Sequence, residues 1–235
     1  MKFASLSVFF PAYNDALSLP ALLHQTFAVL KQFVEDYEVI VVNDGSRDHT
    51  AQVLDEFGRD HGSRFRVVTH AGNLGYGRAL RSGFEAARKQ FVFYTDGDGQ
   101  YDVNELPLLL DQVQERTGLV NGYKLARHDP AHRIWIGDIY NFCARLLFRI
   151  RIRDIDCDYR LIRRDLLEKI HLTSTSGTIC VELVRKLELS GWHVAEVPVH
   201  HYARKYGKSQ FFRFRSLAIT LFQLLRLWFR LVVFR

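Results

Sequence analysis

The stretch Phe91 to Asp102, FVFYTDGDGQYD, joins a short apolar run to an acidic turn. The run that ends at Tyr94 has the length and composition of a buried strand. Directly after it, Asp96, Asp98 and Asp102 place three carboxylates within seven residues. Tight turns favour Asp and Gly for backbone reasons alone, so the stretch by itself leaves two interpretations open: a simple turn or a metal site.

The same pattern recurs along the chain, because short runs rich in Val, Ile and Phe alternate with segments of helical period. This alternation predicts an α/β fold with a mostly parallel central sheet covered on both faces. The expected strands are residues 6–10, 39–42, 65–68, 91–94, 119–120 and 192–199, and the expected helices are residues 18–35, 50–57, 77–89, 135–148, 163–170 and 178–189.

Polar and acidic residues follow the first four expected strands. Ligands of such sheets bind beyond the carboxyl ends of the strands, so we expect these loops to form one site. Two carboxylates in one glycine-containing loop, Asp96 and Asp98, are hard oxygen donors that suit Mg²⁺ or Mn²⁺ bound together with a diphosphate. The loops concerned are residues 11–15, 43–48, 70–77 and 96–102.

The composition is that of a globular protein, with 48% hydrophobic and 25% charged residues in a chain of 235. No linker or repeat divides it, so we expect a catalytic domain over residues 1–210 with a C-terminal extension over 211–235. The three cysteines lack metal-site spacing, and the amino terminus resembles a first strand more than a signal peptide. These features predict a cytoplasmic location.

The positive charge is concentrated at the C-terminal end. The net charge is +6, but residues 197–235 contain eight Lys and Arg and no acidic residue. At helical spacing, Arg226 and Arg230 share a polar face, and Leu224, Trp228 and Leu231 share an apolar one. Arginines within the window disfavour a membrane span.

Two interpretations of this helix remain open. It lies in the interface of an anionic membrane, with the apolar face and Trp228 entering the acyl region and the arginines near the headgroups, or it packs on the protein's own core or in a dimer. Nucleic acid is not an expected partner, because the cations share a helix with a broad apolar face and lack a base-reading pattern.

The ordered stretches FFPAYND, VIVVNDGSRDHT, NLGYGRALRSG and YTDGDGQYD resemble family 2 glycosyltransferases of the GT-A fold. The later stretches VNGYKLARHDP, RDIDCDYRLIRRD and WHVAEVPVHHYARKYGKSQFF resemble the branch that transfers sugars to polyprenyl phosphates, as dolichyl-phosphate mannose synthases and undecaprenyl-phosphate glycosyltransferases do. The resemblance covers about residues 5 to 215 and implies a GT-A three-layer α/β sandwich.

The resemblance assigns roles to individual residues. It implies that Asp98 and Gln100 ligate Mg²⁺ or Mn²⁺, that Asp98, Asp156 and Arg204 are catalytic, and that Asp156 acts more in positioning than in deprotonation. A structural salt-bridge or helix-capping role for Asp156, Asp158 and Arg160 stays open. The implied nucleotide-sugar contacts are Pro11, Ala12, Tyr13, Asp15, Asp44, Gly45, Asp96, Gly97 and Arg204, and the implied acceptor-phosphate contacts are Lys124, Arg127, Arg133 and Ser209.

The implied activity is inverting transfer from GDP-mannose or a UDP-hexose to dolichyl or undecaprenyl phosphate, by an enzyme peripheral to the cytoplasmic membrane face. Two alternatives are kept: a GT-A transferase that acts on a saccharide hydroxyl, and a nucleotide-binding or adaptor protein with a decayed site. The retained Asp96, Asp98, Gln100 and Arg204 argue against decay.

Overall fold

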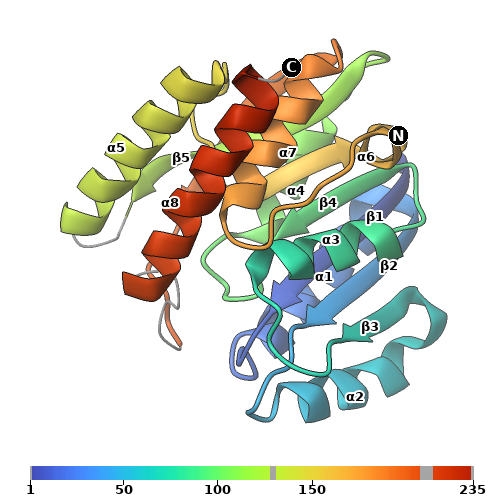
Figure 1. Ribbon diagram of the computed structural model, residues 1–235. Helices are drawn as coiled ribbons and strands as arrows, with labels where there is room; N and C mark the ends of the chain where they lie inside the picture. Colours follow the sequence, from blue (N-terminus) through green and yellow to red (C-terminus); the bar gives the residue numbers. More distant parts are fainter. Residues whose placement is uncertain (1, 128–130, 207–213, 234–235) are drawn as a thin grey trace.

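The computed structural model describes residues 2–127, 131–206 and 214–233. It has three layers, a central sheet between two layers of helices (Figure 1). The strands are β1 (Phe3–Ala12), β2 (Val34–Asn43), β3 (Phe65–Thr69), β4 (Phe91–Thr95), β5 (Thr117–Arg127), β6 (Tyr159–Arg163) and β7 (His193–His201).

The sheet order over the described residues is β3-β2-β1-β4-β6-β5-β7. β1 to β4 are parallel, β5 pairs in parallel with β7, and β6 pairs antiparallel with both β4 and β5. The expected α/β class with a mostly parallel sheet is therefore confirmed. β6 was not expected as a strand, because Arg160 and Arg163 interrupt its short apolar run and its pairing partners β4 and β5 are distant in sequence.

Helices cover both faces because successive strand residues point to opposite sides. Phe10 packs in one core cluster with the helices of one face, and its neighbour Phe9 packs in the other. One face carries α1 (Leu19–Phe33), α2 (Thr50–His61) and α4 (Leu106–Leu110); the other carries α3 (Tyr76–Ala86), α5 (Ala131–Phe148), α6 (Arg164–Lys169), α7 (Thr178–Leu189) and α8 (Phe214–Trp228). Short turns cover Gly62–Arg64 and Val103–Glu105, and a π-helical turn, Phe229–Val233, follows α8.

The C-terminal helix α8 packs against the body of the protein beside α7 (Figure 1). Leu224, Trp228 and Leu231 lie against the core, and Trp228 Nε1 donates to Leu147 O at 3.0 Å. Arg230 forms an ion pair of 2.6 Å with Glu182 of α7. The face of α8 that contains Trp228 therefore packs on the protein's own core, which was one of the expected interpretations, and the membrane contact of this helix stays a prediction. Across the described ranges, every helix falls short of the length or apolarity of a membrane span.

Candidate functional site

Three loops meet where β1, β2 and β4 end. The amide of Asp44 donates to Ala12 O at 2.9 Å, and the amide of Gly97 donates to Pro11 O at 3.2 Å. Ser18 Oγ at the start of α1 donates to Gly97 O at 2.8 Å. The end of β1 is thus held between the loops after β2 and β4, which brings the predicted nucleotide-sugar residues to one edge of the sheet.

Asp15 lies in the loop after β1, with its carboxylate accepting from the amide of Tyr13 at 2.9 Å. Burial and the nearby charge of Asp98 raise the pKa of Asp15 to about 6, although the Tyr13 amide and Arg204 act in the opposite direction. Near neutral pH, the ionised carboxylate of Asp15 therefore lowers the stability of the folded protein. A cation or a hydrogen-bond donor brought by a ligand would stabilise the ionised form.

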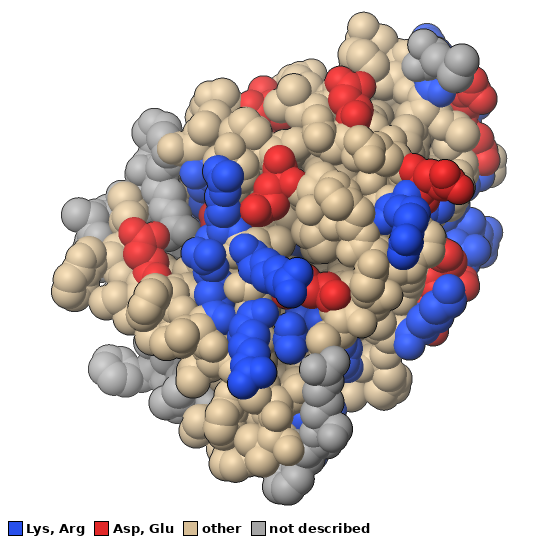
Figure 2. Space-filling model, turned by 90° about the horizontal axis from the view of Figure 1, so that it is seen from above, with Lys and Arg blue, Asp and Glu red and all other residues tan. Residues whose placement is uncertain are grey.

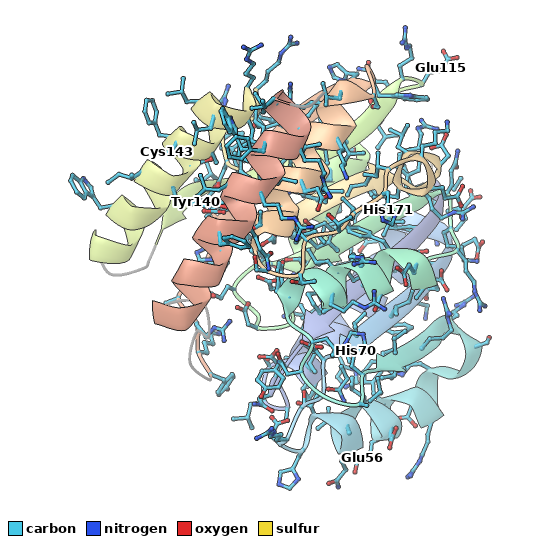
Figure 3. The ribbon with its side chains drawn as sticks, in the orientation of Figure 1. Glu56, His70, Glu115, Tyr140, Cys143 and His171 are labelled. Atoms are coloured by element: carbon cyan, nitrogen blue, oxygen red, sulfur yellow. The ribbon has the colours of Figure 1, made fainter. Side chains whose placement is uncertain are left out.

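Asp44 is buried and bonds within the chain. Its two carboxylate oxygens accept from the amides of Leu74 and Gly75, each at 2.9 Å, and Oδ1 lies 2.6 Å from Nδ1 of His70 at the end of β3 (Figure 3). These bonds fix the loop that enters α3. The expected contact between Asp44 and the base stays a prediction.

Gly45 has a backbone reason to be glycine. Its φ is +67°, and a Cβ there would lie 2.3 Å from the carbonyl carbon of Gly72. The loop before α3 therefore crosses directly over the turn after β2, at a distance that only glycine permits. The expected nucleotide contact of Gly45 is untested by this geometry and stays a prediction.

Asp96 follows β4 and accepts a hydrogen bond of 2.9 Å from the hydroxyl of Tyr76, the first residue of α3. Burial raises the pKa of Asp96 well above its usual range, and the negative charges of Asp158 and Asp98 add to this, opposed by Tyr76 and Arg204. An acid held in this way favours a cationic or hydrogen-bonding ligand.

Asp98 is only 6% exposed and pairs with the segment after β7. One carboxylate oxygen accepts from the amide of Gln100 at 3.0 Å, and the other accepts from the guanidinium of Arg204 in an ion pair. The side-chain amide of Gln100 donates to Tyr202 O at 3.0 Å, and the amide of Tyr202 donates back to Gln100 O at 2.8 Å. These bonds bring Arg204, distant in sequence, to the acidic turn.

The donors at this turn fit a divalent cation only in part. In the stretches that the structure describes, no group of three His, Cys, Asp or Glu side chains is arranged to hold a metal ion. Mg²⁺, however, is usually held by one or two carboxylates together with waters and substrate phosphates. Asp98 with the amide oxygen of Gln100 fits such a site, which the diphosphate of a ligand would complete. Arg204 supplies the positive charge at Asp98 in this structure.

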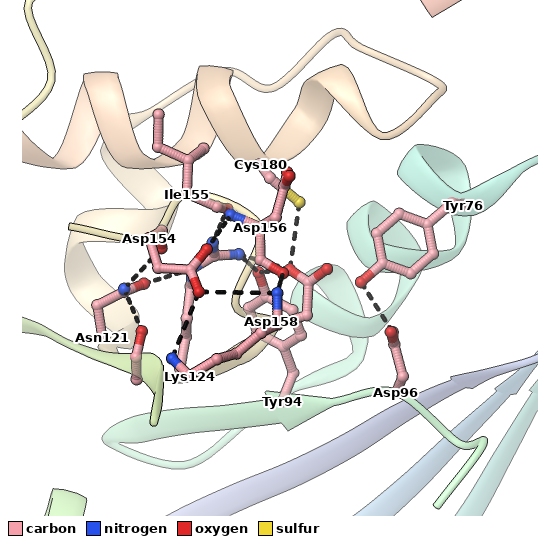
Figure 4. A network of polar contacts seen from close by, with 12 residues as sticks. Tyr76, Tyr94, Asp96, Asn121, Lys124, Asp154, Ile155, Asp156, Asp158 and Cys180 are labelled. Carbon is pink, nitrogen blue, oxygen red and sulfur yellow. Dashed lines mark hydrogen bonds and ion pairs between the residues drawn. The ribbon is translucent and has the colours of Figure 1, made fainter. Parts of the chain in front are cut away.

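A buried network lies next to Asp96 (Figure 4). Arg160 on β6 is fully buried and donates to Asn121 Oδ1 at 2.7 Å and to Asp158 Oδ1 at 2.6 Å. The same Asp158 oxygen accepts from the Tyr94 hydroxyl at 3.2 Å and from Cys180 Sγ at 3.2 Å. The expected salt bridge between Asp158 and Arg160 is present, with Arg160 on β6 and Asp158 just before this strand and not at a helix cap.

Lys124, an expected acceptor-phosphate contact, points into the protein. Its side chain is 9% exposed, and its ammonium group donates to Asp156 O at 2.7 Å and lies 3.7 Å from Asp154 Oδ2. Its role with a phosphate stays a prediction, as does the positioning role of Asp156. The side chains of Arg127 and Arg133, and all of Ser209, lie outside the described residues.

The sequence analysis did not single out Tyr76, which reaches from α3 to Asp96. Tyr76 lies in the loop of residues 70–77, which was expected to contribute to the site, and the positive φ of the preceding Gly75 turns the chain into α3. An aromatic residue with a polar tip, placed at the start of a helix beside the ligand edge, was the available signal.

Residues 7–171 match the model of the family described as "Glycosyl transferase family 2". The chain is 31% identical over 214 residues to an undecaprenyl-phosphate 4-deoxy-4-formamido-L-arabinose transferase of Pseudomonas fluorescens (strain SBW25), covering 91% of this chain and 62% of that protein. A protein of the same name from Pseudomonas aeruginosa (strain LESB58) is 30% identical over 212 residues, covering 90% of this chain and 62% of that protein. The chain thus spans about three fifths of the length of these relatives.

Solved structures of glucosyl-3-phosphoglycerate synthase from Mycobacterium tuberculosis have the same fold. One, in complex with Mn²⁺, UDP and glucosyl-3-phosphoglycerate, has a TM-score of 0.69 at 18% identity and covers 96% of this chain and 78% of that one. Another, in complex with Mg²⁺ and UDP, has a TM-score of 0.69 at 17% identity and covers 93% of this chain and 78% of that one. The expected GT-A type of α/β fold is confirmed.

Proposed function

The chain belongs to glycosyltransferase family 2, and on that premise we propose that it is a metal-dependent, inverting enzyme that moves a sugar from a nucleotide sugar to a polyprenyl phosphate. The observation that carries the proposal is the likeness, over about nine tenths of the chain, to relatives whose names give undecaprenyl phosphate as acceptor. The donor is GDP-mannose or a UDP-hexose.

The nucleotide sugar binds along the edge formed by the loops after β1, β2 and β4. The segment from Pro11 to Tyr13, with Asp15 and Asp44, contacts the nucleotide, and Asp96 contacts ribose and sugar. The raised pKa values of Asp15 and Asp96 support this placement, because both carboxylates gain from donors that a ligand brings.

Asp98 and Gln100 would hold Mg²⁺ or Mn²⁺, and the bound ion would neutralise the charge that develops on the departing nucleoside diphosphate. Arg204 then exchanges its contact with Asp98 for one with the diphosphate, since a guanidinium group donates two parallel hydrogen bonds to phosphate oxygens. The ion pair between Arg204 and Asp98 supports this step, because it puts the arginine within reach of the same place. Solved structures of the same fold are complexes that contain Mn²⁺ or Mg²⁺ together with UDP.

The acceptor needs little activation. A phosphate with a second pKa near 6 is largely ionised at neutral pH, so an oxygen of the lipid phosphate attacks the anomeric carbon without a strong base. Asp156 then positions the acceptor. Arg127, Arg133 and Ser209 contact its phosphate, and Lys124 joins them by exchanging its present partners.

A polyprenyl acceptor stays in the bilayer, so the enzyme works at the cytoplasmic face of an anionic membrane. The basic residues of the C-terminal end favour this attachment by roughly 1 kcal/mol each near the surface. Arg226 of α8 is exposed and suits this role.

A panel of nucleotide sugars, each with Mn²⁺, tests the donor by thermal shift. A donor at about 100 times its dissociation constant adds roughly 2.7 kcal/mol of stability, and we expect this shift for one nucleotide sugar in wild type and not in Asp98→Asn. A panel without any shift, or an equal shift in the variant, would contradict the donor site.

A further inference from the structure

An apolar stripe on α5 faces solvent. Trp135, Ile139, Phe142 and Leu146 repeat at helical spacing and are between 48% and 72% exposed. The opposite side of α5, with Ala144 and Phe148, packs in the core. One side of α5 therefore already packs on the protein, and the exposed stripe is a second apolar face on the other side of the helix.

A matching stripe lies on α8 and the turn that follows it. Phe222, Leu225, Phe229 and Val233 are between 48% and 68% exposed. α5 and α8 pack against the same core cluster and run side by side (Figure 1), and the hydrogen bond from Trp228 to Leu147 O joins them. Because the two helices are neighbours, we treat the two stripes together and call them the α5–α8 face.

Basic side chains border the α5–α8 face. Figure 2 shows Lys and Arg gathered on the side of the molecule where the C-terminal ends of α5 and α8 lie in Figure 1. The acidic residue on α5 is Asp138. Among the side chains that the structure describes on these helices and just after them, the exposed arginines are Arg145, Arg149, Arg151, Arg153, Arg226 and Arg230. Arg153 pairs with Glu196 and Arg230 with Glu182.

Resting on the proposed function, which supplies a lipid acceptor, we propose that the α5–α8 face docks on an anionic bilayer, with α5 contributing as much of the lipid contact as α8. Large exposed apolar residues bordered by arginines are the pattern of an interfacial surface. A second copy of the chain fits less well, because a symmetric contact would bring two arginine borders together. The outward stripe of α8 thus replaces the inward face that contains Trp228 in contacting lipid.

Three leucine substitutions of equal chemistry test this surface. Leu146→Gln changes α5, Leu225→Gln changes α8, and Leu108→Gln is the matched control, since Leu108 is 44% exposed on α4 on the other side of the sheet. The full chain is mixed with vesicles of phosphatidylcholine with about one third phosphatidylglycerol and sedimented. We expect the partition coefficient to fall about tenfold for Leu146→Gln and for Leu225→Gln, and to stay at the wild-type value for Leu108→Gln.

Two further measurements separate the outcomes. Sugar transfer to a prenyl phosphate short enough to dissolve in water should be equal in wild type and the three variants. If wild type shows no such transfer, the proposed function is refuted while the vesicle result stands. Wild-type partition by Leu146→Gln would overturn the role of α5. A wild-type dimer that both outer-face variants convert to monomers in sedimentation velocity would overturn the bilayer as the occupant.

Discussion

Replacing Glu182 by Gln should loosen α8 and the loop before α7 together. Glu182 is completely buried on α7, and its carboxylate accepts from the amides of Thr173 and Ser174 at 3.1 and 2.8 Å. Lys186 and Arg230 donate to the same group at 2.7 and 2.6 Å. The carboxylate thus joins a loop of the body to the C-terminal helix.

The expected loss follows from the pKa of Glu182. Burial opposes its ionisation, but hydrogen bonds from Lys186, Ser174 and Thr173 outweigh burial and lower the pKa from 4.5 to about 2. Such a difference corresponds to roughly 3 kcal/mol of stability, which solvent around the partly exposed Arg230 reduces to about 2 kcal/mol. Because the folded pKa is the lower one, this stabilisation is present above pH 4.5 and is lost as the pH falls towards 2.

Urea unfolding at several pH values measures this effect. Glu182→Gln should lose about 2 kcal/mol at pH 7 and progressively less below pH 4.5. Glu188→Gln on the same helix is the control of opposite sign, because burial raises the pKa of Glu188 despite the amides of Arg151 and Ile152. The stability that Glu188 contributes is lost as the pH rises above 4.5, so its variant should gain relative to wild type there. A loss in Glu182→Gln that is the same at pH 7 and pH 3 would refute the reasoning.

Three further predictions concern the acidic edge. Tyr76→Phe removes the hydrogen bond to Asp96, so kcat/KM for the nucleotide sugar should fall about tenfold in steady-state kinetics, and an unchanged value would exclude a positioning role for Tyr76. Asp98→Asn should lower turnover at least about 100-fold at saturating Mn²⁺, whereas near-normal turnover would remove the metal assignment. The pKa of Asp15 is raised from 3.8 to about 6, so the stability that its neutral form contributes is lost as the pH rises from about 4 through 6. In urea unfolding with chelator, Asp15→Asn should therefore exceed wild type by about 2 kcal/mol at pH 7.5 and match it at pH 4. Equal stability of the two proteins at both pH values would contradict the raised pKa.

The sequence predicted the elements whose apolar pattern is local. The runs that became β1, β2 and β4 are apolar on both faces, as buried parallel strands are. β6 escaped prediction because its position in the sheet depends on partners far away in sequence. Arg160 is tolerated in that strand only because Asn121, Tyr94 and Asp158 satisfy its guanidinium.

The site was predictable as a set of loops but not as a set of bonds. The order of the strands brings Asp44, Asp96 and Asp98 to one edge, as the sequence indicated. It could not indicate that Lys124 is paired inward with Asp154, or that Arg204, expected at the same site, forms an ion pair with Asp98 itself across 106 positions of sequence. Similarly, the period of α8 identified two faces but not that the core covers the one containing Trp228.

Transfer of labelled sugar into the organic phase tests the central claim most directly. The chain is incubated with Mn²⁺, each radiolabelled nucleotide sugar and undecaprenyl phosphate in detergent, with soluble sugars as parallel acceptors. We expect one donor to give an organic-soluble labelled product that requires both the lipid phosphate and Asp98. Label that appears only in soluble saccharides, or an organic product formed equally well by Asp98→Asn, would contradict the account.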